Sequence, residues 1–225
     1  MQAHRAFLVK SFCHGRGIEI GAMHHPVPLP PELKVRYLDR FSISGLRDQY
    51  KEIKDQPMVE VDIVDNGETL ATLPDASEDF IIACQFIEHC QNPVRAIVNM
   101  LRVVRNQGFV LITAPDKRFT FDVDRPITTN QHILDECLHG TEHTALQHFR
   151  EWTTLVDKIT DPVEAEKSVQ WLVEKDYSIH FHVWDSDAFI QFLLFFKEQF
   201  KLPFELYATM QNKMELMVLL RKSLP

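Results

Sequence analysis

Two uninterrupted apolar runs with a helical segment between them constrain the fold of this chain more than any other feature. Residues 79–84 (DFIIAC) and 109–113 (FVLIT) lack polar alternation, which is typical of strands buried on both faces of a parallel sheet. Residues 93–104 (PVRAIVNMLRVV) place apolar side chains at helical spacing and carry proline near the start, where its missing N–H costs little. Strand, helix and strand in this order predict parallel pairing with a right-handed crossover.

The rest of the chain extends this pattern into an α/β sheet. We expect further strands at residues 17–21, 34–38 and 59–64, and helices at 2–13, 44–53 and 185–200. The last helix has Asp185 or Ser186 as its cap. Residues 204–210 and 215–221 predict an antiparallel hairpin at the sheet edge. The fold class is therefore a Rossmann-like sheet, mostly parallel, with an antiparallel C-terminal hairpin.

Length and charge limit the domain count and the partners. The chain has 225 residues and a formal net charge of −8, so we expect one domain over 1–225 and no affinity for nucleic acid or anionic membranes. No window predicts a signal peptide or membrane span, which favours a cytoplasmic location. The four cysteines form no CxxC pair, so we expect reduced thiols and assign no metal site to them.

A glycine-containing stretch, residues 15–26 (GRGIEIGAMHHP), predicts a ligand-binding turn after the first strand. Glycine allows a main chain to approach a ligand closely. A dinucleotide site requires a third glycine and a helix that begins at the phosphates. This chain has Met23 and His25 followed by four prolines up to residue 31, which disfavours an NAD-dependent oxidoreductase.

Several segments together resemble the class I S-adenosylmethionine-dependent methyltransferases. They are GIEIGA, the acid Asp39 that closes the second strand, VEVDIV, and the strand and loop DFIIACQFIEHCQNP. The resemblance covers roughly residues 15–115 and the terminal hairpin. APDKRFTFDVDRPITT, HFREW and HFHVW resemble, more loosely, a bacterial subgroup associated with glycan and secondary-metabolite assembly.

The resemblance implies a cofactor half at 1–115, a substrate-side insertion or lid at 116–184 and a C-terminal helix and hairpin at 185–225. Its cofactor is S-adenosylmethionine, with S-adenosylhomocysteine as product. An acid at the end of the second strand suits the ribose hydroxyls, and Asp62 corresponds to the acceptor for the adenine amino group. The cofactor-binding residues that we expect are Gly17, Glu19, Gly21, Ala22, Asp39, Arg40, Asp62, Ile63, Gln85, Phe86 and His89.

The insertion is rich in histidine, and three interpretations stay open. His180 and His182 alternate on a strand-like segment, and His139 and His143 are four apart, spacings that suit a metal. Imidazoles near pH 7 equally serve as general bases, and structural histidines are the third alternative. We predict His148, His180 and His182 as catalytic, without a metal.

Acceptor-binding residues are expected in the same segment. A guanidinium binds a carboxylate or phosphate in bidentate fashion, acids follow the fifth strand, and aromatic rings form walls. The predicted set is Asp116, Arg118, Asp122, Arg125, His143, Arg150, Trp152 and Trp184.

The sequence thus predicts a methyltransferase acting on an O or N nucleophile of a small molecule that carries sugar, amino or carboxylate groups. A monomer or homodimer is expected. The alternatives are a non-catalytic binding or partner module of the same fold, and a metal-assisted methyltransferase that uses the histidines.

Overall fold

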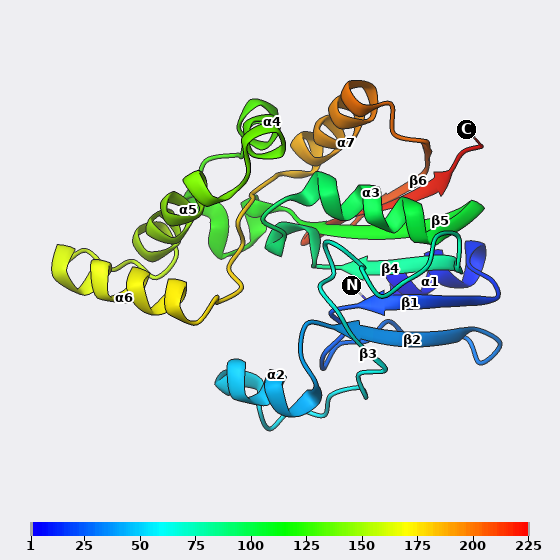
Figure 1. Cartoon of the computed structure of the whole chain (residues 1–225), viewed down its shortest axis with the longest axis horizontal. Coiled ribbons are helices and arrows are strands. Elements are labelled where there is room, and N and C mark those ends of the chain that lie inside the picture. The colour runs from blue at the N-terminus through cyan, green and yellow to red at the C-terminus, as the bar shows by residue number, and fades with distance from the viewer. Residues whose placement is uncertain (1, 225) are drawn as a thin grey trace.

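A seven-stranded sheet forms the centre of the computed structural model, which describes residues 2–224. The strand order is β3-β2-β1-β4-β5-β7-β6 (Figure 1). The bounds are β1 Arg16–Ile20, β2 Lys34–Asp39, β3 Ile63–Val64, β4 Glu78–Cys84, β5 Val104–Pro115, β6 Phe204–Gln211 and β7 Glu215–Lys222. The first five strands pair in parallel, and β7 pairs antiparallel with β5 and β6. The predicted fold class is confirmed.

The strand order reverses at β1, because β2 lies on one side of it and β4 on the other. In open α/β sheets, ligands bind outside the carboxyl ends of the strands at such a reversal. The fold therefore places its binding site after β1, β2 and β4.

Helices cover both faces of the sheet. On β4, Ile81 and Ala83 face a core formed with α3 (Pro93–Val103) and α7 (Ser186–Phe200), which lie above the sheet in Figure 1. Phe80 and Ile82, one position out of phase, pack against α1 (Gln2–Phe12) on the other face. Burial on both faces is what removes polar alternation from this strand.

Side-chain caps fix where the helices begin. Asp185 accepts a hydrogen bond from the Ala188 N–H at 2.8 Å, so Asp185 and not Ser186 caps α7. Asn92 caps α3 in the same way, directly before Pro93. Asp161 caps α6 (Pro162–Glu174). Such caps satisfy backbone donors that the first helical turn leaves free.

Residues 116–184 form the predicted helical insertion. Two short 3₁₀ turns, Lys117–Phe119 and Phe121–Asp124, precede α4 (Asn130–His139), α5 (Glu142–Leu155) and α6. These helices project beyond the carboxyl ends of the parallel strands, on the left of Figure 1. An extended segment, residues 179–184, leads back to α7. The division into one domain with this lid stays a prediction.

Three elements differ clearly from the expected bounds. The strand expected at 109–113 is longer, because β5 begins at Val104, directly after α3, and continues to Pro115. The third strand was expected at 59–64, and β3 contains only Ile63–Val64. It is the edge strand and pairs with β2 only through Leu38 and Asp39. Before it, the Tyr37 N–H donates to the Asp62 side chain and the Val59 N–H donates to the Met23 carbonyl, which interrupts the ladder. The expected helix 44–53 is divided into α2 (Ile43–Gln49) and a 3₁₀ turn at Lys51–Ile53.

Candidate functional site

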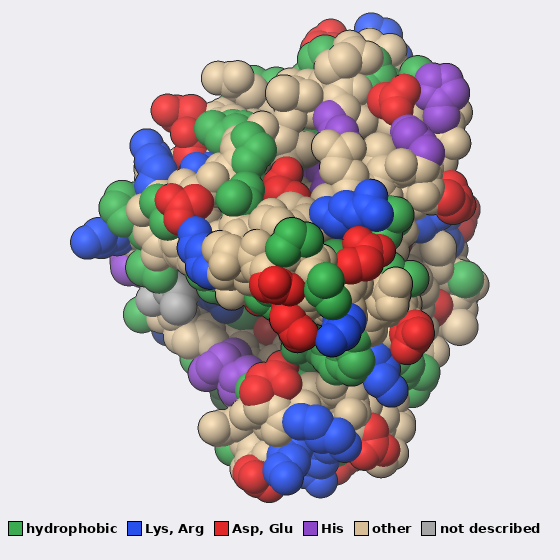
Figure 2. Space-filling view, turned by 90° about the vertical axis from the view of Figure 1, so that its left-hand side faces the viewer, with side chains coloured by type: hydrophobic (Ala, Val, Ile, Leu, Met, Phe, Trp, Pro, Cys, Tyr) green, Lys and Arg blue, Asp and Glu red, His purple; other side chains and the backbone are tan. Residues whose placement is uncertain are grey.

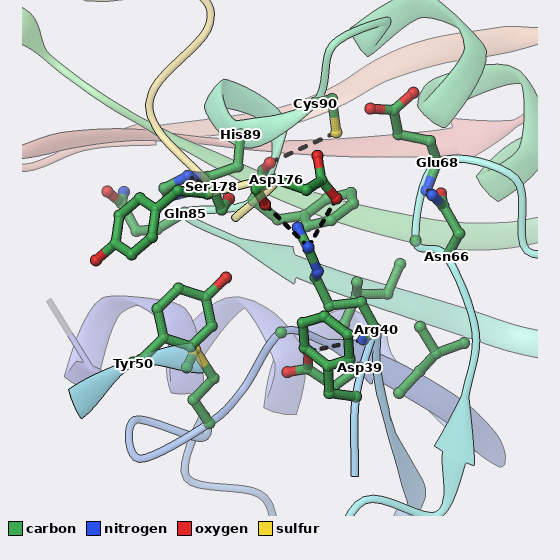
Figure 3. A pocket seen from close by; sticks show the side chains of 18 of the residues that line it. Asp39, Arg40, Tyr50, Asn66, Glu68, Gln85, His89, Cys90, Asp176 and Ser178 are labelled. Atoms are coloured by element: carbon green, nitrogen blue, oxygen red, sulfur yellow. Dashed lines mark hydrogen bonds and ion pairs between the residues drawn. The ribbon is translucent and has the colours of Figure 1, made fainter. Parts of the chain in front are cut away.

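A cavity of about 540 Å³ lies at the carboxyl ends of β1, β2 and β4. Its wall includes six of the predicted cofactor residues, namely Gly21, Asp39, Arg40, Gln85, Phe86 and His89. Figure 3 shows Asp39 and Arg40 on one side and Gln85 and His89 on another, with Asn66 and Glu68 opposite. These residues come from three separate strand ends, so the reversal in strand order brings them together.

The turn after β1 leaves room beside its backbone. Gly21 has φ +66°, and a Cβ there would meet only Phe86 Cδ2, at 3.9 Å. Its N–H donates to the Leu38 carbonyl at 2.9 Å, which ties the turn to β2. A side chain at this position would be strained and would occupy open cavity space.

Glu19 is buried next to this turn and stabilises it. It is 1% exposed, and its carboxylate accepts a hydrogen bond from the Val27 N–H at 2.9 Å. Burial raises the pKa of Glu19 to about 7. The side chain thus organises the loop that follows Gly21 and does not line the cavity.

Asp39 closes β2 and faces the cavity. Its carboxylate is mostly buried and accepts a hydrogen bond from the Arg40 N–H at 2.7 Å. Burial raises the pKa of Asp39 to about 6. A desolvated carboxylate of this kind gains strongly from hydroxyl donors of a ligand.

A strap formed by residues 175–178, after α6, crosses to the cofactor half and covers the cavity. Arg40 donates to the Asp176 carboxylate at 2.8 Å, and Figure 3 shows the two side chains meeting across the opening. Tyr177 donates its hydroxyl to Glu52 at 3.0 Å, and its ring meets that of Tyr50 edge to face at 5.7 Å. The insertion therefore completes the cavity wall.

An oriented histidine lies next to the far end of the cavity. His180 Nδ1 is 2.7 Å from Asp122 Oδ2, and its ring meets that of the cavity residue His89 at 4.7 Å. Although burial raises the pKa of Asp122, hydrogen bonds from His180 and Arg125 lower it below its usual value. An ionised Asp122 holds the proton of His180 on Nδ1 and leaves Nε2 as an acceptor.

Arg125 holds the pair formed by His180 and Asp122 in place. Its side chain is fully buried, pairs with Asp122 at 2.9 Å and with Glu151 at 2.8 Å, and donates to the His180 carbonyl at 2.8 Å. These contacts engage Nε and Nη1 of the guanidinium, while Nη2 is buried without a hydrogen-bond partner.

Glu88 and His89 are two buried titratable groups beside His180. One nitrogen or carboxylate oxygen of each of these three residues lies within 4.8 Å of the others. Glu88 is 0% exposed, and burial raises its pKa well above the usual value. Burial also lowers the pKa of His89 to about 3. Burial therefore favours the uncharged forms of both groups beside this histidine.

The other two predicted catalytic histidines lie elsewhere. His148 Nε2 is 2.9 Å from Glu136 Oε1, and His182 Nε2 is 3.5 Å from Glu136 Oε2. Burial lowers the pKa of His182 to about 3. Both belong to a separate cluster with His132, away from the cavity wall.

Four predicted cofactor residues besides Glu19 do not line the cavity. Gly17 lies within β1, where a Cβ would come within 2.5 Å of the Phe80 ring, so its role is close packing. Asp62 is exposed and accepts a hydrogen bond from the Tyr37 N–H at 2.8 Å, because β3 begins only after it. The other two are Ala22, which is 8% exposed, and Ile63, which packs on the core.

Most predicted acceptor residues are engaged within the chain. Asp116 binds the Ser186 hydroxyl and Arg118 at the start of α7. His143 and Arg150 are exposed and pair with Asp135 and Glu166. Trp184 is buried in the core beside Phe189 and Phe192. Of the predicted set, Asp122, Arg125 and Trp152 surround His180.

The sequence interpretation missed several cavity residues. They are Tyr50, Glu52, Asn66, Glu68, Asp176, Tyr177 and Ser178. A usable signal existed for Asn66, because Asp65 and Asn66 directly follow the apolar pair Ile63–Val64. None existed for the strap, since its position depends on how the insertion folds back.

Charged side chains of both signs are mixed on one face of the surface (Figure 2). Figure 2 shows Lys, Arg, Asp and Glu side chains intermingled on the side that carries the insertion. Within residues 2–224, no helix has both the length and the apolar character needed to cross a membrane.

Comparisons with known proteins agree with this geometry. Residues 44–112 match the family model described as a methyltransferase domain. Two proteins of Mycobacterium tuberculosis strains, each described as a probable S-adenosylmethionine-dependent methyltransferase, are 32% identical to this chain over 108 residues. The match covers 48% of this chain and 36% of each relative, so it spans about a third of their length.

Solved structures show the same fold at low identity. The carbon methyltransferase CurJ superposes with a TM-score of 0.53 at 10% identity, covering 100% of this chain and 54% of its own. An S-adenosylmethionine-dependent methyltransferase of Methanosarcina mazei gives 0.50 at 12% identity, covering 97% and 98%.

Strand order and site together define a class I methyltransferase fold. Residues 44–112 are similar to a methyltransferase domain, and the resemblance to the S-adenosylmethionine-dependent enzymes is confirmed. The cofactor that this family implies is S-adenosylmethionine.

Proposed function

We propose that this chain transfers the methyl group of S-adenosylmethionine to an oxygen or nitrogen nucleophile of a small molecule and releases S-adenosylhomocysteine. The observation that carries the proposal is the cavity at the strand-order reversal, which adjoins the pair formed by His180 and Asp122. We retain the predictions of a cytoplasmic monomer or homodimer that binds no nucleic acid.

The charge of the cavity fits this cofactor better than a dinucleotide. Four acids line it, namely Asp39, Glu52, Glu68 and Asp176, and the arginine among the lining residues, Arg40, is paired with Asp176. A sulfonium and an ammonium group are favoured there, whereas phosphates would meet like charges. The volume is within the roughly 300–1,000 Å³ typical of small-molecule sites.

Each side of the cavity suits one part of the cofactor. Asp39 would accept hydrogen bonds from the ribose hydroxyls, and Asn66 would offer amide groups to the adenine edge, with Phe86 as an apolar wall. Gln85 and His89 would border the methionine moiety. Asn66 takes the role first expected for Asp62, because it lies directly after β3 and lines the cavity.

The chain's own contribution to the reaction is orientation and proton removal. The cofactor supplies an activated methyl group when it is bound. His180 Nε2 would take the proton that the acceptor's O–H or N–H loses, while Asp122 stabilises the imidazolium that forms. Trp152 and Phe121, with rings 5.8 and 4.9 Å from that of His180, would form walls around the acceptor.

The engaged arginines narrow the class of acceptor. Arg125 is held by two carboxylates, and Arg118 and Arg150 pair with acids away from His180. Glu88, whose uncharged form is favoured by burial, would donate a hydrogen bond to an acceptor oxygen. These contacts favour an acceptor with hydroxyl or amino groups, such as a sugar-like molecule, over a carboxylate.

Transfer of labelled methyl groups tests this function. The protein is incubated with methyl-labelled S-adenosylmethionine and fractions of small metabolites, and product is counted. We expect His180→Ala to lower transfer by roughly 10²- to 10⁴-fold, the usual contribution of a general base, without loss of cofactor binding. His143→Ala, an exposed histidine paired with Asp135, is the matched control.

Two results would contradict the proposal. Wild-type transfer in His180→Ala would remove the base from the mechanism. Cofactor binding without transfer to any fraction would favour the alternative of a non-catalytic module of the same fold.

A further inference from the structure

Four side chains from three separate elements of the insertion converge away from the cavity. His132 and Glu136 lie one turn apart on α4, His148 lies on α5, and His182 lies on the segment that precedes α7. Their nearest nitrogen and oxygen atoms all lie within 4.8 Å of one another. The proposed transfer reaction uses none of them.

Three of these atoms form a triangle in which hydrogen bonds alone cannot satisfy every donor and acceptor. His132 Nε2 lies 3.1 Å from His148 Nε2, and these two nitrogens lie 3.1 and 2.9 Å from the same oxygen, Glu136 Oε1. If both nitrogens carry protons, the two N–H groups oppose each other. If one lacks a proton, its lone pair faces the carboxylate oxygen. Thr144 also donates to this oxygen, at 2.5 Å.

Burial increases the free-energy cost of leaving these polar atoms poorly paired. The exposed fraction is 1% for the Glu136 side chain and 0% for that of His182. Glu136 Oε2 is buried without a hydrogen-bond partner and faces His182 Nε2 at 3.5 Å. A buried carboxylate oxygen without a hydrogen-bond partner requires compensation, which a cation bound among these imidazoles would supply.

We propose that His132, Glu136, His148 and His182 bind a zinc ion. Zn²⁺ takes imidazole nitrogens and carboxylate oxygens in a tetrahedron with bonds of about 2.0–2.1 Å, whose edges are about 3.4 Å. The three edges among His132 Nε2, His148 Nε2 and Glu136 Oε1, of 2.9, 3.1 and 3.1 Å, are slightly shorter than that value. The fourth ligand atom, His182 Nε2, lies 3.5 Å from the other oxygen of the same carboxylate, Oε2. Three neutral imidazoles and one carboxylate suit zinc over the hard cations Mg²⁺ and Ca²⁺.

The ligand set defines the role of the ion. Four protein ligands close the coordination shell, which is the arrangement of structural sites. The ion would join α4 and α5 to the segment of residues 179–184, which also carries His180. His182 Nε2 lies 3.2 Å from the Gln91 carbonyl. To bind zinc through Nε2, this imidazole must give up that hydrogen bond and carry its proton on Nδ1.

Zinc titration of the chelator-treated protein by calorimetry tests the site. We expect one zinc ion per chain, and a rise in melting temperature with zinc concentration. His132→Ala, which removes the most exposed ligand of the four, should weaken binding by on the order of 100-fold or more. His143→Ala, on the neighbouring α5 but bound to Asp135 at the surface, should bind zinc as the wild type does.

Cobalt provides a readout that does not depend on a folded variant. Co²⁺ in the wild-type protein should give the intense visible absorption of a four-coordinate ion. The proposal is overturned if the wild type binds no zinc in a one-to-one ratio, or if cobalt shows only the weak bands of a six-coordinate ion. Equal losses in His132→Ala and His143→Ala would also overturn it.

Discussion

Replacing Asp39 by asparagine separates cofactor recognition from stability. The change keeps the shape of the side chain, removes its charge and leaves one acceptor oxygen in place of two. A hydrogen bond to a charged group contributes about 1.5–3 kcal/mol. Loss of about one such bond to a ribose hydroxyl should weaken S-adenosylmethionine binding by roughly 10- to 150-fold.

Asp39→Asn should weaken cofactor binding but increase the stability of the protein without cofactor. Burial raises the pKa of Asp39 in the folded state to about 6, above its unfolded value, so the fold loses stability as pH rises from about 4 to 6. A neutral side chain avoids that loss. At pH 7 we expect Asp39→Asn to raise the free energy of unfolding by on the order of 1–3 kcal/mol.

Asp39 also predicts the pH dependence of cofactor binding. The charged carboxylate is the better acceptor, so wild-type affinity should fall as pH drops through about 6. Asp39→Asn lacks this titrating group and should show a flatter profile between pH 5 and 7.

Calorimetry and urea denaturation, with Asp62→Asn as the matched control, check this reasoning. Asp62 is an acid on the neighbouring segment, is exposed and lies outside the cavity wall, so its substitution should leave cofactor affinity unchanged. Equal loss of affinity in the two variants would refute the placement of the site. Destabilisation of the free protein by Asp39→Asn would refute the burial argument.

Three further substitutions test the packing and electrostatics around the sites. Arg125→Met should cost about 3–5 kcal/mol in unfolding free energy, because it leaves the Asp122 carboxylate buried without its guanidinium, and urea denaturation measures this. Gly17→Ala should cost about 1–3 kcal/mol through overpacking against Phe80 and leave the cofactor affinity of the folded fraction unchanged, which calorimetry checks. Glu19→Gln should stabilise the protein at pH 8, because the pKa of Glu19, raised to about 7, makes the wild type lose stability between about pH 4.5 and 7; thermal melts at pH 5 and 8 test the sign.

The sheet was predictable because its signals are local. The runs 79–84 and 109–113 are apolar on both faces, and the helix between them has a proline at its start. The edge strand was less predictable. Residues 59–61 alternate as a strand does, but they form no ladder with β2, because the Tyr37 N–H donates to the Asp62 carboxylate and the Val59 N–H donates to the Met23 carbonyl. Pairing partners are a tertiary property, which a short alternating segment does not reveal.

The edge strand also bears on the predicted site. Asp62 was expected near the end of the third strand, but β3 begins only at Ile63, and Asn66, two residues beyond its end at Val64, reaches the cavity. Gly21 and Asp39 were placed correctly at the cavity because their strands end where the sequence pattern ends.

The residues of the insertion were the hardest to place. His132 and Glu136 are four apart on a helix, a spacing that could have revealed them, but His148 and His182 join them only through tertiary packing. His139 and His143, which also share this spacing, meet at the exposed Asp135. Spacing along one helix therefore does not identify which histidines meet in the fold.

Titration of the purified chain with S-adenosylmethionine, S-adenosylhomocysteine and NAD tests the central claim most directly. The acidic cavity with its paired arginine predicts that both sulfur ligands bind at one site per chain and that NAD neither binds nor competes. Binding of NAD together with failure of both sulfur ligands would contradict the account.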